Sequence, residues 1–184
     1  MNRVIVEEYN PLWATQFNEL KANLWPRLHD LASAIEHVGS TSVPGLAAKP
    51  FLDIDVVISD RSMLPALIER LTKLGYEHRG DLGIVGREAF AVPPNASIAH
   101  KLYVCLAGCL SLRNHLALRD RLRRDSTARD QYAQIKRDLA KRFADDIDMY
   151  VEGKSAFILS ILQQDGVAAT ELESVRVANL APKK

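Results

Sequence analysis

Two aspartates stand inside an otherwise apolar segment, and this pair limits the folds that the chain can form. The segment is Phe51-Leu52-Asp53-Ile54-Asp55-Val56-Val57-Ile58, and its β-rich, apolar character predicts a buried strand. Side chains alternate along a strand, so Asp53 and Asp55 share one face, roughly 6.5–7 Å apart. Carboxylates in apolar surroundings are costly unless a cation compensates them. Mg²⁺ is the natural candidate, because it binds one or two carboxylates and completes its shell with phosphate oxygens and water.

A turn rich in hydroxyl groups precedes this strand. Residues 35–38 predict a short strand that ends at Gly39, and three hydroxyl residues follow it, namely Ser40, Thr41 and Ser42. Pro44 tolerates the first turn of a helix, so we expect a short helical turn to start near it. Backbone N–H groups and hydroxyls at such a start favour a phosphate. The alternative is an ordinary strand-to-helix turn, in which Gly39 permits the bend and the hydroxyls cap the helix.

Hydrophobic periodicity predicts the remaining elements. Helices are expected over 12–36, where Pro26 kinks or divides the run, and over 62–74, 111–124, 126–143 and 147–164. Strands are expected over 76–79, 88–92 and 100–106. Ser111 and Ser126 are positioned as helix N-caps. The order predicts an α+β fold with a small mixed β-sheet, in which residues 1–110 form an α/β core, 111–165 a C-terminal helical bundle packed on it, and 166–184 a flexible tail.

The composition excludes disordered, collagen-like and disulfide-scaffold proteins. Hydrophobic residues make up 47% and charged residues 26%, the values of a globular domain. The 24 Lys and Arg nearly balance the 23 Asp and Glu, so we expect no strong nucleic-acid signature. No apolar run approaches the ~20 residues of a membrane span, and the N-terminus lacks a signal peptide's apolar block, so we expect a cytoplasmic protein. The spacing of Cys105 and Cys109 is not that of a CxxC zinc or redox site.

Several stretches resemble the GrpB (UPF0157) family. Gly39-Ser40 followed by Asp53-Ile54-Asp55 also resembles the signature of the nucleotidyltransferase superfamily with the polymerase-β-like fold. The stretches that carry the family resemblance are 37–55, 79–90, 115–120 and 153–158, within a similarity that runs over about residues 4–165. The resemblance implies a nucleotidyltransferase-type sheet. It also implies that Asp53 and Asp55 hold Mg²⁺ or Mn²⁺, while Gly39 and Ser40 contact the phosphates of a nucleoside triphosphate such as ATP.

The superfamily uses a third acid, and here the sequence departs from that pattern. The strand at 100–106 offers His100 where an acid is expected. Glu88 is the best acidic substitute and our candidate for a third catalytic residue, and Asp81 is a weaker one. The incomplete set is compatible with one metal ion, with a histidine ligand, or with a site that binds nucleotides without turning them over.

Basic residues complete the predicted nucleotide site. In the helical half, His115 and Arg119, Tyr132 and Lys136, and Tyr150 and Lys154 stand at i and i+4, so each pair shares a helix face. By the resemblance, such a bundle walls the nucleotide site opposite the sheet. The predicted nucleotide-binding residues are therefore Gly39, Ser40, Thr41, Ser42, Lys49, Arg87, His100, Arg119, Lys136 and Lys154. Solvated helix faces, and an ordinary ion pair between Arg87 and Glu88, are the alternatives.

These observations predict a metal-dependent nucleotidyltransferase that transfers a nucleotidyl group from a nucleoside triphosphate to an unidentified acceptor. The alternative is a non-catalytic nucleotide-binding or accessory module. Residues 1–60 contain 8 acidic and 4 basic residues, whereas residues 111–142 contain 4 acidic and 10 basic residues. An acidic segment and a basic segment of this kind suit a magnesium–triphosphate complex bound between them. The sequence does not indicate an oligomeric state.

Overall fold

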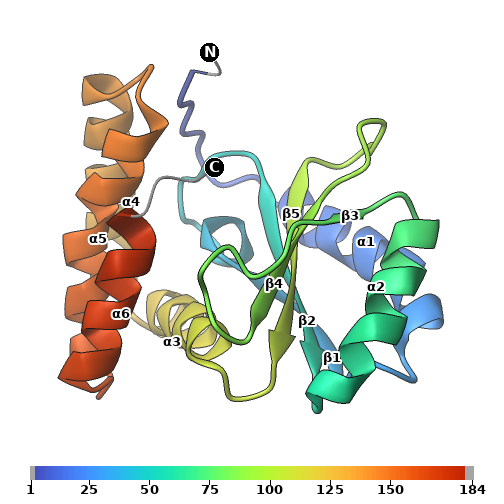
Figure 1. Cartoon of the computed structure of the whole chain (residues 1–184). Helices are drawn as coiled ribbons and strands as arrows, with labels where there is room; N and C mark the ends of the chain where they lie inside the picture. The colour runs from blue at the N-terminus through green and yellow to red at the C-terminus, as the bar shows by residue number, and fades with distance from the viewer. Residues whose placement is uncertain (1–2, 181–184) are drawn as a thin grey trace.

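A five-stranded mixed sheet forms the centre of the molecule in the computed structural model, which describes residues 3–180 (Figure 1). Across the sheet the strands are β1 (Ala34–Val38), β2 (Leu52–Ile58), β5 (His100–Leu106), β4 (Arg87–Ala91) and β3 (Glu77–His78). β2 and β5 run parallel, and the other neighbours are antiparallel. The predicted α+β class and small mixed sheet are confirmed.

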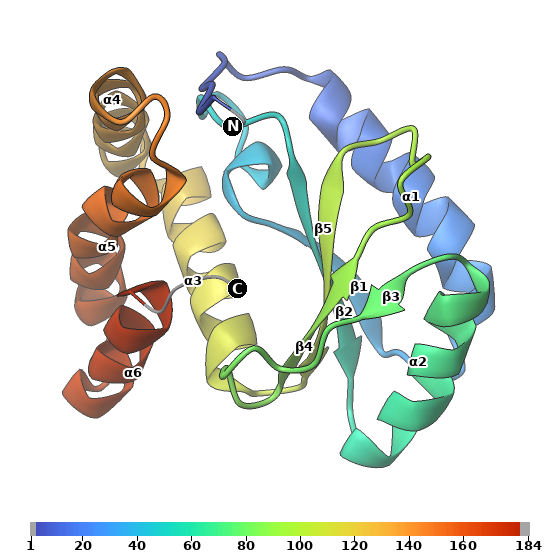
Figure 2. The same cartoon turned by 45° about the horizontal axis from the view of Figure 1, so that its top comes forward.

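Two helices, α1 (Leu12–Leu28) and α2 (Leu64–Lys73), cover one face of the sheet (Figure 2). Apolar residues recur every three or four positions in both, so each helix turns an apolar stripe to the sheet. α1 is shorter than the predicted 12–36, because residues 34–38 pair with β2. Pro26 lies inside the last turn of α1 and does not divide it. A short 3₁₀ helix, η2 (Arg61–Met63), leads into α2.

The C-terminal helices lie on the other face. They are α3 (Leu110–Arg124), α4 (Ser126–Arg142), α5 (Ile147–Gln164) and α6 (Ala169–Leu180). Ser126 is wrong as an N-cap, because the preceding Asp125 accepts the hydrogen bond from the Ala128 N–H. Ser111 is also wrong as an N-cap, since α3 already begins at Leu110. None of the helices within residues 3–180 is long and apolar enough to cross a membrane.

The segment predicted as a flexible tail contains α6. This helix packs along α5, and an ion pair between Glu171 and Arg113 ties it to α3. Residues 181–184 of the predicted tail lie outside the described part of the chain.

Two large hydrophobic clusters, and a small one between α3 and the sheet, hold these layers together. The larger lies between the sheet and the helices α1 and α2, and it includes Trp13, Leu28 and Leu67. The second joins the turn before β2 to α3, α4 and α5; its buried members are Val43, Leu46, Ala47, Leu122, Ala128, Tyr132, Ala133 and Ile161. The second cluster therefore fixes the hydroxyl-rich turn against the C-terminal helices.

Candidate functional site

The sheet register places Asp53 and Asp55 on the face that is turned to the C-terminal helices. Asp53 is paired with Lys101 of β5, and Asp55 with Tyr103 of β5. On its other side, Asp55 is paired with Glu36 of β1. Paired residues project from the same face of a sheet, so all five side chains belong to one surface.

Asp55 is fully buried, and only one of its oxygens has a partner. Its Oδ2 accepts a hydrogen bond from Nδ1 of His115 on α3 at 2.7 Å. Its Oδ1 is buried without a hydrogen-bond partner. Burial lowers the pKa of His115, but the hydrogen bond to Asp55 and the carboxylate charge outweigh it, so the net shift of the pKa is upward. An unpartnered buried carboxylate oxygen is costly, and a cation bound there would remove that cost.

Asp53 lies directly against the backbone of Gly39. Gly39 has φ +68° and ψ −173°, a conformation that only glycine adopts readily. A Cβ at this position would stand 2.2 Å from Oδ2 of Asp53. The 3₁₀ helix η1 (Ser40–Ser42) begins at the next residue, so the helical turn starts at Ser40 and not near Pro44 as predicted.

The three hydroxyls of this turn have different roles. Ser42 is buried, and its hydroxyl donates to the Gly39 carbonyl at 2.6 Å. Thr41 is buried as well; its hydroxyl lies 3.0 Å from Nε2 of His37 and 3.4 Å from the Phe51 carbonyl. Ser40 is half-buried, and its hydroxyl is hydrogen-bonded to Tyr132 of α4. Thr41 and Ser42 therefore stabilise the turn, and the Ser40 hydroxyl links the turn to Tyr132 of α4.

Lysines gather around Asp53. The negative charge of Asp53 raises the pKa of the exposed Lys101. Burial lowers the pKa of Lys49, and the nearby charge of Lys101 lowers it further, while Asp53 opposes both. The Nζ atoms of Lys49 and Lys154 lie 5.9 Å and 4.6 Å from the ring centroid of Tyr150. Lys49, Lys101 and Lys154 thus supply positive charge at the Asp53 end of the site.

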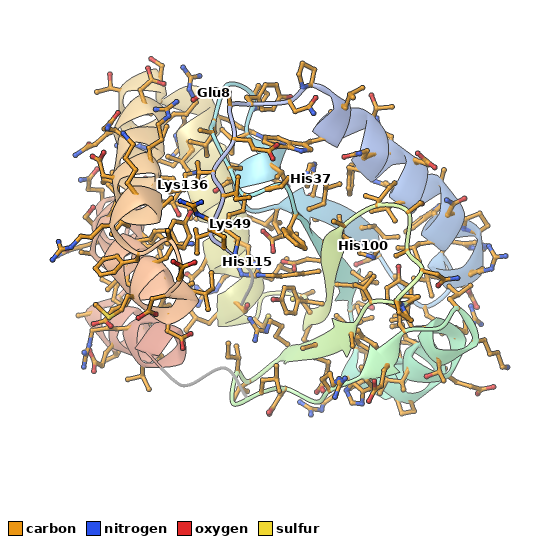
Figure 3. The ribbon with its side chains drawn as sticks, turned by 90° about the horizontal axis from the view of Figure 1, so that it is seen from above. Glu8, His37, Lys49, His100, His115 and Lys136 are labelled. Carbon is orange, nitrogen blue, oxygen red and sulfur yellow. The ribbon has the colours of Figure 1, made fainter. Side chains whose placement is uncertain are left out.

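Lys136 is in the same region but is covered by protein. Figure 3 shows it with Lys49 and His115 between the sheet and the C-terminal helices. Only 1% of Lys136 is exposed, and its Nζ donates to the Ala47 carbonyl and lies 4.6 Å from the Tyr132 ring centroid. Burial, assisted by the charges of Lys154 and Arg137, lowers its pKa to about 6. Lys136 therefore links α4 to the turn, and the structure does not present it to a nucleotide.

Arg119 also makes contacts within the protein. Its guanidinium donates to Glu36 at 2.7 Å, to Asp120 at 2.7 Å and to the His37 carbonyl at 3.2 Å. The bonds to Glu36 and to the His37 carbonyl fasten α3 to β1. The predicted phosphate contact of Arg119 would require it to give up these partners.

The structure does not bring Glu88 and His100 to the aspartates. The register pairs Glu88 with Val104 and His100 with Leu52, so both lie on the opposite face, toward α1 and α2. Glu88 contacts His78 at 2.8 Å and Arg61 at 3.6 Å. His100 contacts the Tyr76 hydroxyl at 2.9 Å and the Ile98 carbonyl at 2.7 Å (Figure 3). Glu88 as a third metal-binding acid therefore does not fit this geometry, nor does His100 as a nucleotide ligand.

The weaker acid candidate, Asp81, is exposed in the loop between β3 and β4 and accepts a hydrogen bond from the Gly83 N–H. Within residues 3–180, no three His, Cys, Asp or Glu side chains are grouped as metal ligands. Asp53 and Asp55, with one free carboxylate oxygen on Asp55, fit a single Mg²⁺ whose other ligands are water and phosphate oxygens.

Arg87 lies on the aspartate face and forms no ion pair with Glu88, because consecutive strand residues point to opposite sides. Its register partner is Cys105, and its guanidinium carbon lies 4.5 Å from the Tyr103 ring centroid. Its Nε is buried without a hydrogen-bond partner.

The sequence reasoning missed Glu36, Lys101 and Tyr103 as site residues. The alternation in 100–106 separates Lys101 and Tyr103 from Leu102 and Val104, and that signal was present in the sequence. Their pairing with Asp53 and Asp55 depends on the parallel contact of β2 with β5, which joins distant segments.

Comparisons with known proteins agree with this fold. The model of the GrpB protein family matches residues 3–164. The UPF0157 protein YqkA of Bacillus subtilis (strain 168) is 33% identical over 150 residues, which are 82% of this chain and 43% of YqkA. This chain therefore matches less than half of the length of YqkA.

Solved structures show the same similarity. The crystal structure of the conserved protein GrpB from Enterococcus faecalis is 32% identical and has a TM-score of 0.78, covering 93% of this chain and 99% of that one. The Cid1 poly(U) polymerase with Mg 3′-dATP bound is 14% identical, with a TM-score of 0.53 over 84% of this chain and 49% of that one. The second likeness shows a shared fold of the nucleotidyltransferase type.

Replacing Gly39 with alanine is expected to destabilise the protein. The positive φ and the contact of the new Cβ with the Asp53 carboxylate should together lower the free energy of unfolding by about 2–3 kcal/mol in urea titrations. Gly80→Ala is the matched control, since Gly80 has φ +76° and nothing within 4 Å of its Cβ position. Equal losses in both variants would contradict the close approach of Gly39 to Asp53.

Lys136 is expected to make stability depend on pH. Its folded pKa of about 6 lies far below its ordinary value, so the unfolded chain binds more protons between pH 6 and about 10. Wild-type free energy of unfolding, relative to Lys136→Met, should therefore rise with pH by up to ~1.4 kcal/mol per unit. Urea unfolding at pH 6, 7, 8 and 9 measures this difference. Lys73→Met, at an exposed site, is the control, and its free energy of unfolding should depend on pH as that of wild type does. The same pH dependence in Lys136→Met and wild type would contradict the lowered pKa of Lys136.

Proposed function

This chain belongs to the GrpB family, and we propose that it is a metal-dependent nucleotidyltransferase. It would transfer a nucleotidyl group from a nucleoside triphosphate to an acceptor, with Asp53 and Asp55 holding Mg²⁺ or Mn²⁺. The observation that carries the proposal is the buried Asp55, whose Oδ1 has no partner and which shares its face with Asp53. The Cid1 structure holds a magnesium nucleotide within the same fold, which supports the proposal.

The bound cation would neutralise phosphate charge in the transition state. The chain's own residues would bind and orient the nucleotide. Ser40 directly follows Gly39, which lies against Asp53, and its hydroxyl would donate to a phosphate oxygen in place of Tyr132. Lys49 and Lys101 place positive charge where the triphosphate would lie next to Asp53. This is catalysis by positioning and charge neutralisation.

His115 has a positioning role in this scheme. By donating to Oδ2 of Asp55, it fixes the carboxylate and leaves Oδ1 as the oxygen that is presented to the cation. Such an outer hydrogen bond orients a ligating carboxylate and fixes its geometry.

One observation favours the alternative, a module that binds nucleotides without turning them over. The strand position opposite Asp55 holds Tyr103, and the one opposite Asp53 holds Lys101, so β5 contributes no third carboxylate to this face. Glu36 is an acid on the same face, but it is paired with Arg119 at 2.7 Å. Release of pyrophosphate from a labelled nucleoside triphosphate separates the two candidates.

Asp53→Asn is expected to weaken metal-dependent nucleotide binding. The variant removes a charged ligand, so the affinity for the magnesium complex of an α,β-methylene nucleoside triphosphate should fall at least about tenfold (~1.4 kcal/mol). Calorimetric titration of all four analogues, with and without Mg²⁺, measures the change. Asp138→Asn, at an exposed position on α4, is the matched control and should bind as wild type does. Unchanged binding by Asp53→Asn would rule out its proposed role.

A further inference from the structure

The positive groups on the aspartate face fall into two sets. Lys49 and Lys101 are coupled to Asp53, at the end of the site that contains Ser40. Arg87 and His115 lie instead around Tyr103, the register partner of Asp55. Successive same-face positions along a strand are about 6.5–7 Å apart, so Tyr103 lies one such position beyond Lys101 on β5. The two sets are neighbours, since the charge of Arg87 still opposes the rise that Asp53 causes in the pKa of Lys101.

Arg87 reaches this second region from β4. Its register partner is Cys105, one same-face position beyond Tyr103. The guanidinium nevertheless lies over the Tyr103 ring, 4.5 Å from the centroid, so the side chain turns back toward Asp55. The His115 ring approaches the same tyrosine from α3, with ring centroids 6.4 Å apart. The Tyr103 ring is therefore in contact with the Arg87 guanidinium and close to the His115 imidazole.

The contact with Tyr103 does not satisfy all the binding groups of the Arg87 guanidinium. A cation–π contact uses the face of the guanidinium, whereas its N–H groups lie in the plane. The buried Nε has no partner, and leaving a buried donor unpaired is unfavourable. The planar edge of a guanidinium matches two oxygens of a phosphate. Arg87 therefore has the geometry of a phosphate ligand without the phosphate.

We infer that Arg87, beside Tyr103 and His115, binds a phosphate group of the acceptor. The acceptor class is thus a phosphate-bearing molecule. This inference rests on the proposed function, since it assigns the Asp53 end of the site to the triphosphate and the Asp55 end to the second substrate. It also moves Arg87 from the nucleotide side, where the sequence placed it, to the acceptor side.

The test is a ³¹P NMR titration of inorganic phosphate into the full chain loaded with Mg²⁺ and the tightest-binding α,β-methylene analogue. The phosphate resonance is separate from those of the analogue, so both ligands are followed at once. Phosphate should bind to the loaded wild type. Arg87→Gln should weaken that binding at least about tenfold and change the affinity for the analogue less than twofold. Arg87→Lys keeps the positive charge but loses the paired N–H donors of the guanidinium, so its phosphate affinity should lie between those of wild type and Arg87→Gln.

Arg61→Gln is the matched control, because Arg61 contacts Glu88 on the opposite face and should leave both ligands unaffected. Acetate is the competing anion, and it should not displace phosphate at equal concentration. Thermal unfolding of each variant confirms that it is folded before binding is compared.

Four results would overturn the inference. Three are absence of phosphate binding in the loaded wild type, unchanged phosphate binding in a folded Arg87→Gln, and a loss of analogue affinity in that variant. The fourth is displacement of phosphate by acetate, which would reject phosphate as the acceptor class. Failure of every analogue to bind would reject the proposed function separately. The same titration without nucleotide would then still decide whether Arg87 binds phosphate.

Discussion

The hydrogen bond between Asp55 and His115 is the interaction on which the site depends. It joins strand β2 to α3, and one turn later along α3 Arg119 makes a second polar link, to Glu36 of β1. The apolar contact between α3 and the sheet is small by comparison, with Val57, Cys105 and Leu112 as its buried members. The two faces of the sheet are therefore built differently. The face under α1 and α2 contributes the main hydrophobic stabilisation, whereas the face under α3 is held by polar pairs and contains the charged groups.

The turn before β2 is held from two sides, and this explains why a buried lysine is tolerated. Gly39 lies against Asp53 on the sheet side. From the helical side, Arg123 donates to the Ser42 carbonyl at 2.7 Å, and Lys136 donates to the Ala47 carbonyl. The burial of Lys136 is unfavourable for its charged form, which its pKa of about 6 reflects. In exchange, a carbonyl that would otherwise be buried without a partner is satisfied, and the turn keeps one position relative to α4.

Much of the fold could be predicted from the sequence, because its elements carry strong local patterns. The strand 100–106 and the helix 147–164 have the bounds that periodicity predicts. The assignment of side chains to faces failed where it depended on register. Glu88 and His100 stand one residue away from Arg87 and Lys101, and a shift of one residue moves a side chain to the other face. The parallel pairing of β2 with β5 decides which of these residues meet the aspartates, and no local pattern contains it. Asp53 and Asp55 could be found because two acids in an apolar strand are costly wherever they lie.

The charges of the site bear on what it binds. Without ligands, Asp53 is already close enough to Lys101 and Lys49 to shift their pKa values, and Glu36 is paired with Arg119. A divalent cation arriving alone would meet these positive groups, and their repulsion would oppose its binding to two carboxylates. A cation that arrives with a triphosphate brings negative charge for the same lysines to neutralise. The arrangement therefore suits the metal and the nucleotide as one unit. The positive charge of this arrangement comes from Lys49 and Lys101, outside the basic segment 111–142, whereas Arg119 and Lys136 of that segment are engaged within the protein.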